Sequence, residues 1–145
     1  MSYGDGGLHY NNPVRVLMDE SRRIWSPSVR QSGCILSIGT GKPKLEAVGD
    51  RGHKILKALA AIVTDTEKIA GEFSNEIDDM DSAERPKYFR FNVDQGLDDV
   101  GLEECEKFEE INGATSYYLE THRKDVEECA DVLLGLIGMS CAYLT

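Results

Sequence analysis

Asp5 is the residue near the start of the sequence whose type and surroundings best suit chemistry. Residues 1–13 read MSYGDGGLHYNNP, so glycines flank the aspartate on both sides. Glycines permit sharp turns and let the backbone come close to a ligand. Asp5 is therefore either an ordinary turn aspartate or a carboxylate held at a strand end, the edge of an α/β sheet where ligands bind. The neighbouring residues leave both interpretations open.

The histidines and cysteines show no spacing typical of a metal or redox site. His9, close to Asp5, is the one histidine placed to act as a base or donor, although two residues in one tight turn rarely face the same reaction centre. The cysteines form no C-x-x-C pair, and we expect reduced thiols, mostly in the core: Cys34, Cys105, Cys129 and Cys141. We expect no metal and no cofactor.

Two further segments resemble ligand-binding loops but fail on specific residues. The segment SIGTGK at 37–42 lacks a phosphate loop's first glycine, because Leu36 stands in its place, and Pro43 replaces the final hydroxyl residue. It is better interpreted as a tight exit from a strand. The acidic run at 78–84 lacks the glycine of a calcium loop, which favours a solvated loop.

Composition narrows the class of partner. The 145 residues carry a net charge of −10 and are 41% hydrophobic, which suits a globular chain with a core. The charge argues against nucleic acid, whose phosphates require clustered Lys and Arg. No apolar run reaches transmembrane length. We expect a soluble, cytoplasmic chain, with peripheral membrane association left open.

The hydrophobic periodicity predicts an α/β chain. A helix is expected from Pro13 to Trp25 with Asn12 as its N-cap, followed by a buried strand within 33–43. A long or broken helix follows from Gly52 to Phe73, then an exposed acidic connection at 75–86. A second strand lies within 88–96, and two helices at 101–111 and 113–137 close the chain.

Two strands, or three if the residues entering Asp5 form one, make a small sheet for so many amphipathic helices. A doubly wound sheet normally has more strands, with helices on both faces. The sequence therefore predicts the C-terminal part of a larger α/β domain.

Several of these motifs, taken in order, resemble the patatin-like phospholipases, most closely the fungal members. The D-G-[GA] motif of that family matches Asp5, Gly6 and Gly7, and its N-N-P step matches residues 11–13. Its S-[IL]-G-T-G strand end matches 37–41, and its Y-F-R-[FIL] segment matches 88–91. The resemblance covers most of the chain, so residues 1–145 are expected to be a partial patatin-like domain.

The resemblance implies a patatin-type α/β/α sandwich related to the α/β hydrolases, and a lipid acyl hydrolase that uses a Ser–Asp dyad on lipid or phospholipid. Asp5 would be the catalytic base, because a carboxylate can take the proton of a serine nucleophile. Gly6 and Gly7 would shape the turn. No G-x-S-x-G elbow occurs in the sequence, so we expect the nucleophile upstream, appended domains in the parent protein, and an inactive chain in isolation.

Two other hypotheses stay open. The chain could be a catalytically inactive, truncated relative that acts as an interaction module, since a sheet edge without a neighbour invites pairing with another chain. An unrelated nucleotide-binding α/β protein is disfavoured by the failed phosphate-loop match.

Overall fold

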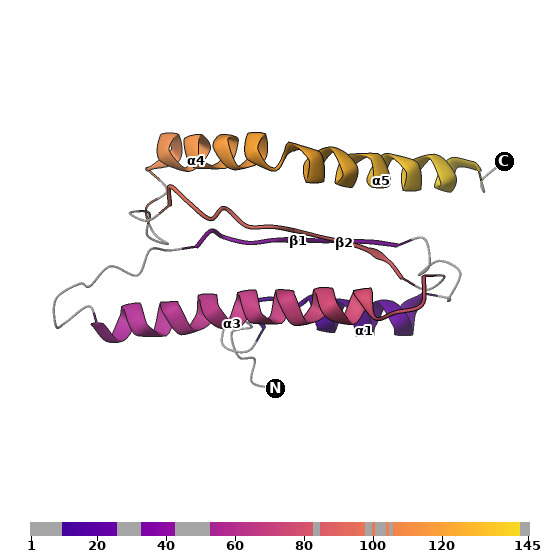
Figure 1. The fold of residues 1–145 in the computed structure, drawn as a ribbon, viewed down its shortest axis with the longest axis horizontal. Coiled ribbons are helices and arrows are strands. Elements are labelled where there is room, and N and C mark those ends of the chain that lie inside the picture. Colours follow the sequence, from indigo (N-terminus) through magenta and orange to yellow (C-terminus); the bar gives the residue numbers. More distant parts are fainter. Residues whose placement is uncertain are drawn as a thin grey trace, which may run out of the picture. The chain divides into compact units, whose positions relative to one another are not determined.

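The computed structural model describes residues 10–25, 33–42, 53–82, 85–97, 100, 104 and 106–142, with side chains from 65 onward in the long central helix and up to 135 in the last helix. The chain divides into two compact units, one of residues 1–31 with 47–86 and one of 32–46 with 87–145. The first contains helices α1 (Val14–Ile24) and α3 (His53–Asp78) (Figure 1). The second contains strands β1 (Cys34–Ile38) and β2 (Lys87–Phe91) with helices α4 (Phe108–Thr121) and α5 (Arg123–Ala142).

Helix α1 forms where it was predicted, but its start and its end differ from the prediction. Pro13 occupies the N-cap position with no side-chain cap, and the Nδ2 group of Asn12 donates instead to the Thr66 carbonyl of α3 at 3.3 Å. Trp25, the last residue of the predicted helix, is 51% exposed. The helix ends at Ile24 and Trp25 takes an extended backbone, so its side chain leaves the helical face.

Helix α3 is one continuous helix, which resolves the long-or-broken alternative in favour of the long form. Its buried side chains Ala70, Phe73 and Ile77 follow at three- and four-residue spacing along one face. The prediction of an exposed connection from residue 75 was therefore wrong at its start. Ile77 extends the apolar face, and burial of that face holds the polar residues around it in the helix.

The two strands form a parallel pair in which Cys34 lies opposite Lys87 and Ile38 opposite Phe91. Parallel strands need a crossover connection, and α3 lies between them in the chain. Strand β1 was predicted to be buried throughout, but its burial alternates: Ile35 and Ser37 are buried, whereas Ile38 is 73% exposed. Within the described residues, only one face of this strand is covered.

Helices α4 and α5 follow one another along the strand pair (Figure 1). The predicted division near residue 112 was wrong, because the helices meet at His122. Gly113 lies inside α4 in open space, and a helix tolerates one glycine at a cost of about 1 kcal/mol. The His122 carbonyl instead accepts the first amides of α5, from Asp125 and Val126, both at 3.1 Å.

The observed elements confirm the coarse prediction of an α/β chain, with mixed helices and a small parallel sheet. None of the helices in the described part of the chain has an apolar stretch long enough to cross a membrane.

Candidate functional site

The carboxyl edge of the β1–β2 pair is the best-defined polar arrangement in the second unit. Two backbone hydrogen bonds continue the strand pairing beyond the strands: Gly39 N donates to the Phe91 carbonyl at 2.7 Å, and Lys42 N donates to the Val93 carbonyl at 2.9 Å. Ligands of open α/β sheets bind at this edge. The loop that follows β1 is therefore fixed at the place where a site is expected.

The side chain of Asn92 holds this loop. Its Oδ1 accepts a hydrogen bond from Gly41 N at 2.8 Å. The backbone N–H of Asn92 donates to the Tyr118 hydroxyl of α4 at 3.2 Å. Asn92 is buried, so these bonds form away from competing water, where leaving a polar group unpaired is costly. The residue thus ties the ends of both strands to a helix. We call Gly39, Gly41, Asn92 and Tyr118 the edge cluster.

Each of the two glycines of the edge cluster has its own structural reason, space beside a side chain for Gly39 and backbone conformation for Gly41. A Cβ at position 39 would lie 2.1 Å from Asn92 Oδ1, so any larger residue there would have to displace the Asn92 side chain. Gly41 has a φ of +95°, in the region that side chains disfavour. The G-x-G pattern is therefore a tight strand exit, as predicted.

Ser37 and Arg90 form a second polar contact in the same strand pair. They are opposite one another in the register, and Arg90 Nη1 donates to Ser37 Oγ at 3.0 Å. Ser37 is buried within β1. Ser140 lies within the helical backbone of α5. Neither serine stands on the strand-to-helix turn that presents a hydrolase nucleophile.

The predicted site residues Asp5, Gly6 and Gly7 lie outside the described residues, as does His9. Their proposed roles stay predictions. His122 is stacked on Tyr118 with ring centroids 4.1 Å apart, and its Nδ1 lies 3.0 Å from the Tyr118 carbonyl. Among the described residues, no three His, Cys, Asp or Glu side chains gather as a metal would require.

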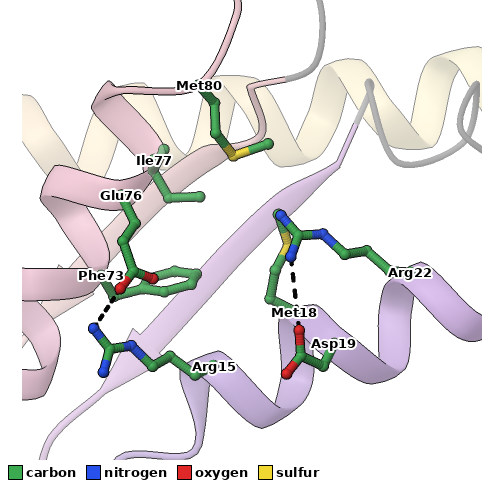
Figure 2. Close-up of a pocket in the computed structure, with 8 residues that line it drawn as sticks. All are labelled: Arg15, Met18, Asp19, Arg22, Phe73, Glu76, Ile77 and Met80. Atoms are coloured by element: carbon green, nitrogen blue, oxygen red, sulfur yellow. Dashed lines mark hydrogen bonds and ion pairs between the residues drawn. The ribbon is translucent and has the colours of Figure 1, made fainter.

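The first unit contains a cavity of about 490 Å³ between α1 and α3 (Figure 2). Its lining combines apolar side chains with charged ones: Arg15, Met18, Asp19, Arg22, Phe73, Glu76, Ile77 and Met80. Figure 2 shows the guanidinium of Arg15 beside Glu76 and that of Arg22 beside Asp19. The charges at its rim are thus paired, and the lining offers neither a serine nor a cysteine as a nucleophile.

The ion pairs of α1 differ from those expected. Arg15, Asp19 and Arg23 are spaced four residues apart, which favours ion pairs among them along the outer face of the helix. Arg15 instead pairs with Glu72 and Glu76 of α3. The reason is that the acidic side of α3 lies alongside it, a contact that spacing within one helix cannot reveal.

Sequence reasoning missed Asn92, Tyr118 and Arg90 as the residues that build the strand-edge geometry. A signal for one of them was present, because Asn92 directly follows the aromatic strand at the point where a polar side chain meets the sheet edge. Tyr118 had no such signal, since only the packing of α4 brings its hydroxyl to the strand end.

Comparisons with known proteins give relatives of one kind. The chain is 27% identical over 131 residues to the calcium-independent phospholipase A2-gamma of Oryctolagus cuniculus, which covers 89% of this chain and 16% of that protein. It is 28% identical over the same length and shares to the proteins of that name from Rattus norvegicus and Homo sapiens. No family model matches the chain, and no solved structure matches it significantly.

The chain thus spans 16% of the length of these relatives. The match extends over nearly all of this sequence, so it includes both strands and most of the helices rather than one short motif. The chain is, at low identity, similar to one portion of a calcium-independent phospholipase A2-gamma.

Proposed function

We propose that this chain is part of a patatin-like lipid acyl hydrolase, to which it contributes the catalytic carboxylate, Asp5. The observation that carries the proposal is the similarity to phospholipase A2-gamma over 89% of the chain. The ordered motifs D-G-G, N-N-P and S-I-G-T-G in the same sequence agree with it. The substrate class is a carboxylic ester of a lipid or phospholipid.

The chemistry follows from what the chain contains and what it lacks. Asp5 accepts the proton of a serine hydroxyl, which then attacks the ester carbonyl and forms an acyl-enzyme that water hydrolyses. The serine comes from a G-x-S-x-G elbow outside this sequence. Gly6 and Gly7 let the chain turn sharply beside the carboxylate. A base without its nucleophile has nothing to activate, so the isolated chain is inactive.

The local structure around the motifs is compatible with this role. Helix α1 begins directly after Asn12 and Pro13, so the N-N-P step marks a helix start. The S-I-G-T-G segment ends β1 and is fixed by the edge cluster. Fixed strand ends suit a catalytic site, because reacting groups must be held close to their productive geometry.

The test is Asp5→Asn in a protein that carries this chain together with its G-x-S-x-G segment. The amide keeps the shape of the side chain but cannot accept the serine proton. We expect kcat for a phospholipid or an aryl ester to fall by about 10²- to 10⁴-fold, the range for loss of a general base.

Asp65→Asn is the matched control, because Asp65 is an exposed aspartate on α3. It should leave turnover unchanged. Turnover that survives Asp5→Asn at the level of the control would refute the proposal.

A second function is supported by the exposed apolar side chains of the second unit. Phe108 of α4 is 69% exposed and Leu134 of α5 is 65% exposed. Such side chains suit contact with another polypeptide, as expected of an interaction module without catalysis. The discriminating observation is the coding sequence upstream of this chain. A G-x-S-x-G segment there supports the hydrolase, and its absence, with stable expression of the chain alone, supports the module.

A further inference from the structure

The cavity between α1 and α3 has an apolar floor. Met18 comes from α1, Phe73 and Ile77 come from α3, and Met80 follows the end of α3. Figure 2 shows these side chains between the two helices. Methionine has a flexible, unbranched side chain that adapts to the shape of an apolar ligand. The cavity volume of about 490 Å³ lies within the range of small-molecule sites, about 300–1,000 Å³, so the floor suits an alkyl chain.

The rim of the same cavity carries equal numbers of positive and negative side chains. Arg15 and Arg22 supply the positive charges, and Asp19 and Glu76 supply the negative ones. An anionic ligand would meet these carboxylates in a chain of net charge −10, and a cationic ligand would meet both guanidinium groups. The charges therefore favour a head group that carries both signs.

Arg22 is the rim cation with the weaker interactions. Arg15 Nη2 donates to Oε2 of Glu72 at 3.2 Å and also to Glu76. Within the described residues, the Arg22 side chain has one ion pair, from Nη1 to Oδ1 of Asp19 at 3.6 Å, and no hydrogen bond. The two side chains of this pair are 47% and 66% exposed, and exposed ion pairs are weak. A phosphate, which arginine can bind through two parallel N–H···O bonds, can therefore replace Asp19.

We propose that this cavity is a binding site for a zwitterionic single-chain amphiphile, a molecule with one alkyl chain and a head group of phosphate and ammonium. The phosphate accepts hydrogen bonds from the Arg22 guanidinium, and the alkyl chain covers the apolar floor. The ammonium group lies beside the carboxylates of Asp19 and Glu76, so Asp19 exchanges one cationic partner for another. Burial of the alkyl chain drives binding, and the charged side chains of the rim fix the orientation of the head group.

The test titrates the full chain with dodecylphosphocholine below its critical micelle concentration, by isothermal titration calorimetry and by the fluorescence of Trp25. This residue is the single tryptophan of the sequence. It is half exposed and lies close to Arg22 in the sequence, so occupation of the site should change its emission. We expect saturable binding of one molecule per chain. Dodecanoate, dodecyltrimethylammonium and phosphocholine without a chain should each bind at least about tenfold more weakly, because each lacks one charge or the alkyl chain.

Arg22→Gln should weaken the binding of dodecylphosphocholine by about tenfold or more, as expected for loss of a charged hydrogen-bond donor. Arg23→Gln is the matched control, because Arg23 is an exposed arginine of the same helix that pairs with Glu20 and does not line the cavity. It should leave the affinity unchanged. Met80→Ser, which removes part of the apolar floor, should also weaken binding, and it tests the same site without a change in α1. Far-ultraviolet circular dichroism checks that each variant is folded.

Four results would overturn the proposal: equal affinity of Arg22→Gln and Arg23→Gln, tighter binding of dodecanoate than of dodecylphosphocholine, uptake of several molecules per chain without saturation, or no binding. Uptake without saturation would indicate adsorption to exposed apolar side chains. The inference does not depend on the proposed hydrolase function, because dodecylphosphocholine has no carboxylic ester and its binding is measured without turnover.

Discussion

At the scale of single residues, the edge cluster shows how side-chain size and backbone angle fix a strand end. Gly39 leaves the space that the Asn92 side chain fills, and Gly41 takes a positive φ that places its amide toward that side chain. Asn92 is in turn bonded to Tyr118. Each residue type is explained by the contact that it makes or permits.

Substitution by alanine is expected to change the free energy of unfolding in opposite directions at Gly39 and at Gly113. Gly39→Ala places a Cβ 2.1 Å from Asn92 Oδ1, and we expect a loss of about 1–3 kcal/mol in the free energy of unfolding, as for an overpacked site. Gly113→Ala lies in open space within α4 and should gain up to about 1 kcal/mol from helix propensity.

Urea denaturation of the two variants beside the unmodified chain checks the prediction. Equal urea midpoints for Gly39→Ala and the unmodified chain would contradict the prediction, because they would show that the strand exit accommodates a Cβ at position 39.

At the scale of elements, α1 and α3 combine a buried apolar contact with exposed ion pairs, and the two contribute very different energies. Phe73 is 2% exposed, whereas the Arg15 side chain and its partner Glu72 are each more than 40% exposed. Exposed ion pairs contribute at most about 1 kcal/mol, because water and salt screen them. The apolar face of α3 therefore dominates the stability of this unit.

Phe73→Ala is accordingly expected to lower the free energy of unfolding by about 3–5 kcal/mol, through lost burial and the cavity that remains. Arg15→Ala should cost about 1 kcal/mol or less, and its effect should shrink at high salt. Thermal or urea denaturation at low and high salt measures both. A larger loss for Arg15→Ala than for Phe73→Ala would contradict this ranking.

The helix boundaries show why elements were predicted better than their ends. Periodicity identified each helix and strand that the structure describes, because an amphipathic face requires regular spacing. It failed at Trp25, at Ile77 and at His122, since those ends depend on tertiary contacts and on local hydrogen bonds. Ending a helix one or two residues earlier or later changes the free energy only slightly, so a single packed side chain can move the helix end.

At the scale of the whole molecule, several large apolar side chains among the described residues are exposed to solvent. Ile38 of β1, Phe108 of α4 and Leu134 of α5 all belong to the second unit and are each more than 60% exposed. Exposed apolar side chains favour contact with another protein surface or with the rest of a longer chain. That pattern agrees with a chain that spans 16% of the length of its relatives. A cytoplasmic location stays a prediction.

The double variant Ile38→Ser/Leu134→Ser should therefore reduce self-association and the binding of a hydrophobic dye. The free energy of unfolding should change by about 1 kcal/mol or less, because both side chains are already largely solvated. Size-exclusion chromatography and dye fluorescence measure these effects. The double variant Thr121→Ser/Asp65→Asn, two exposed polar positions, is the control. Unchanged association in the apolar variant would show that these side chains do not form the contact surface.

The sequence by itself determined the α/β class and the order of the described elements, because these depend on local spacing and residue type. Asp5 with Gly6 and Gly7 became the candidate catalytic motif only through the resemblance to the patatin-like phospholipases, and that assignment stays a prediction. Only the tertiary structure decided that Asn92 and Tyr118 fix the strand edge and that Arg15 pairs with α3. Those contacts join residues far apart in the chain, and their partners are chosen by how strands and helices pack, which no local pattern specifies.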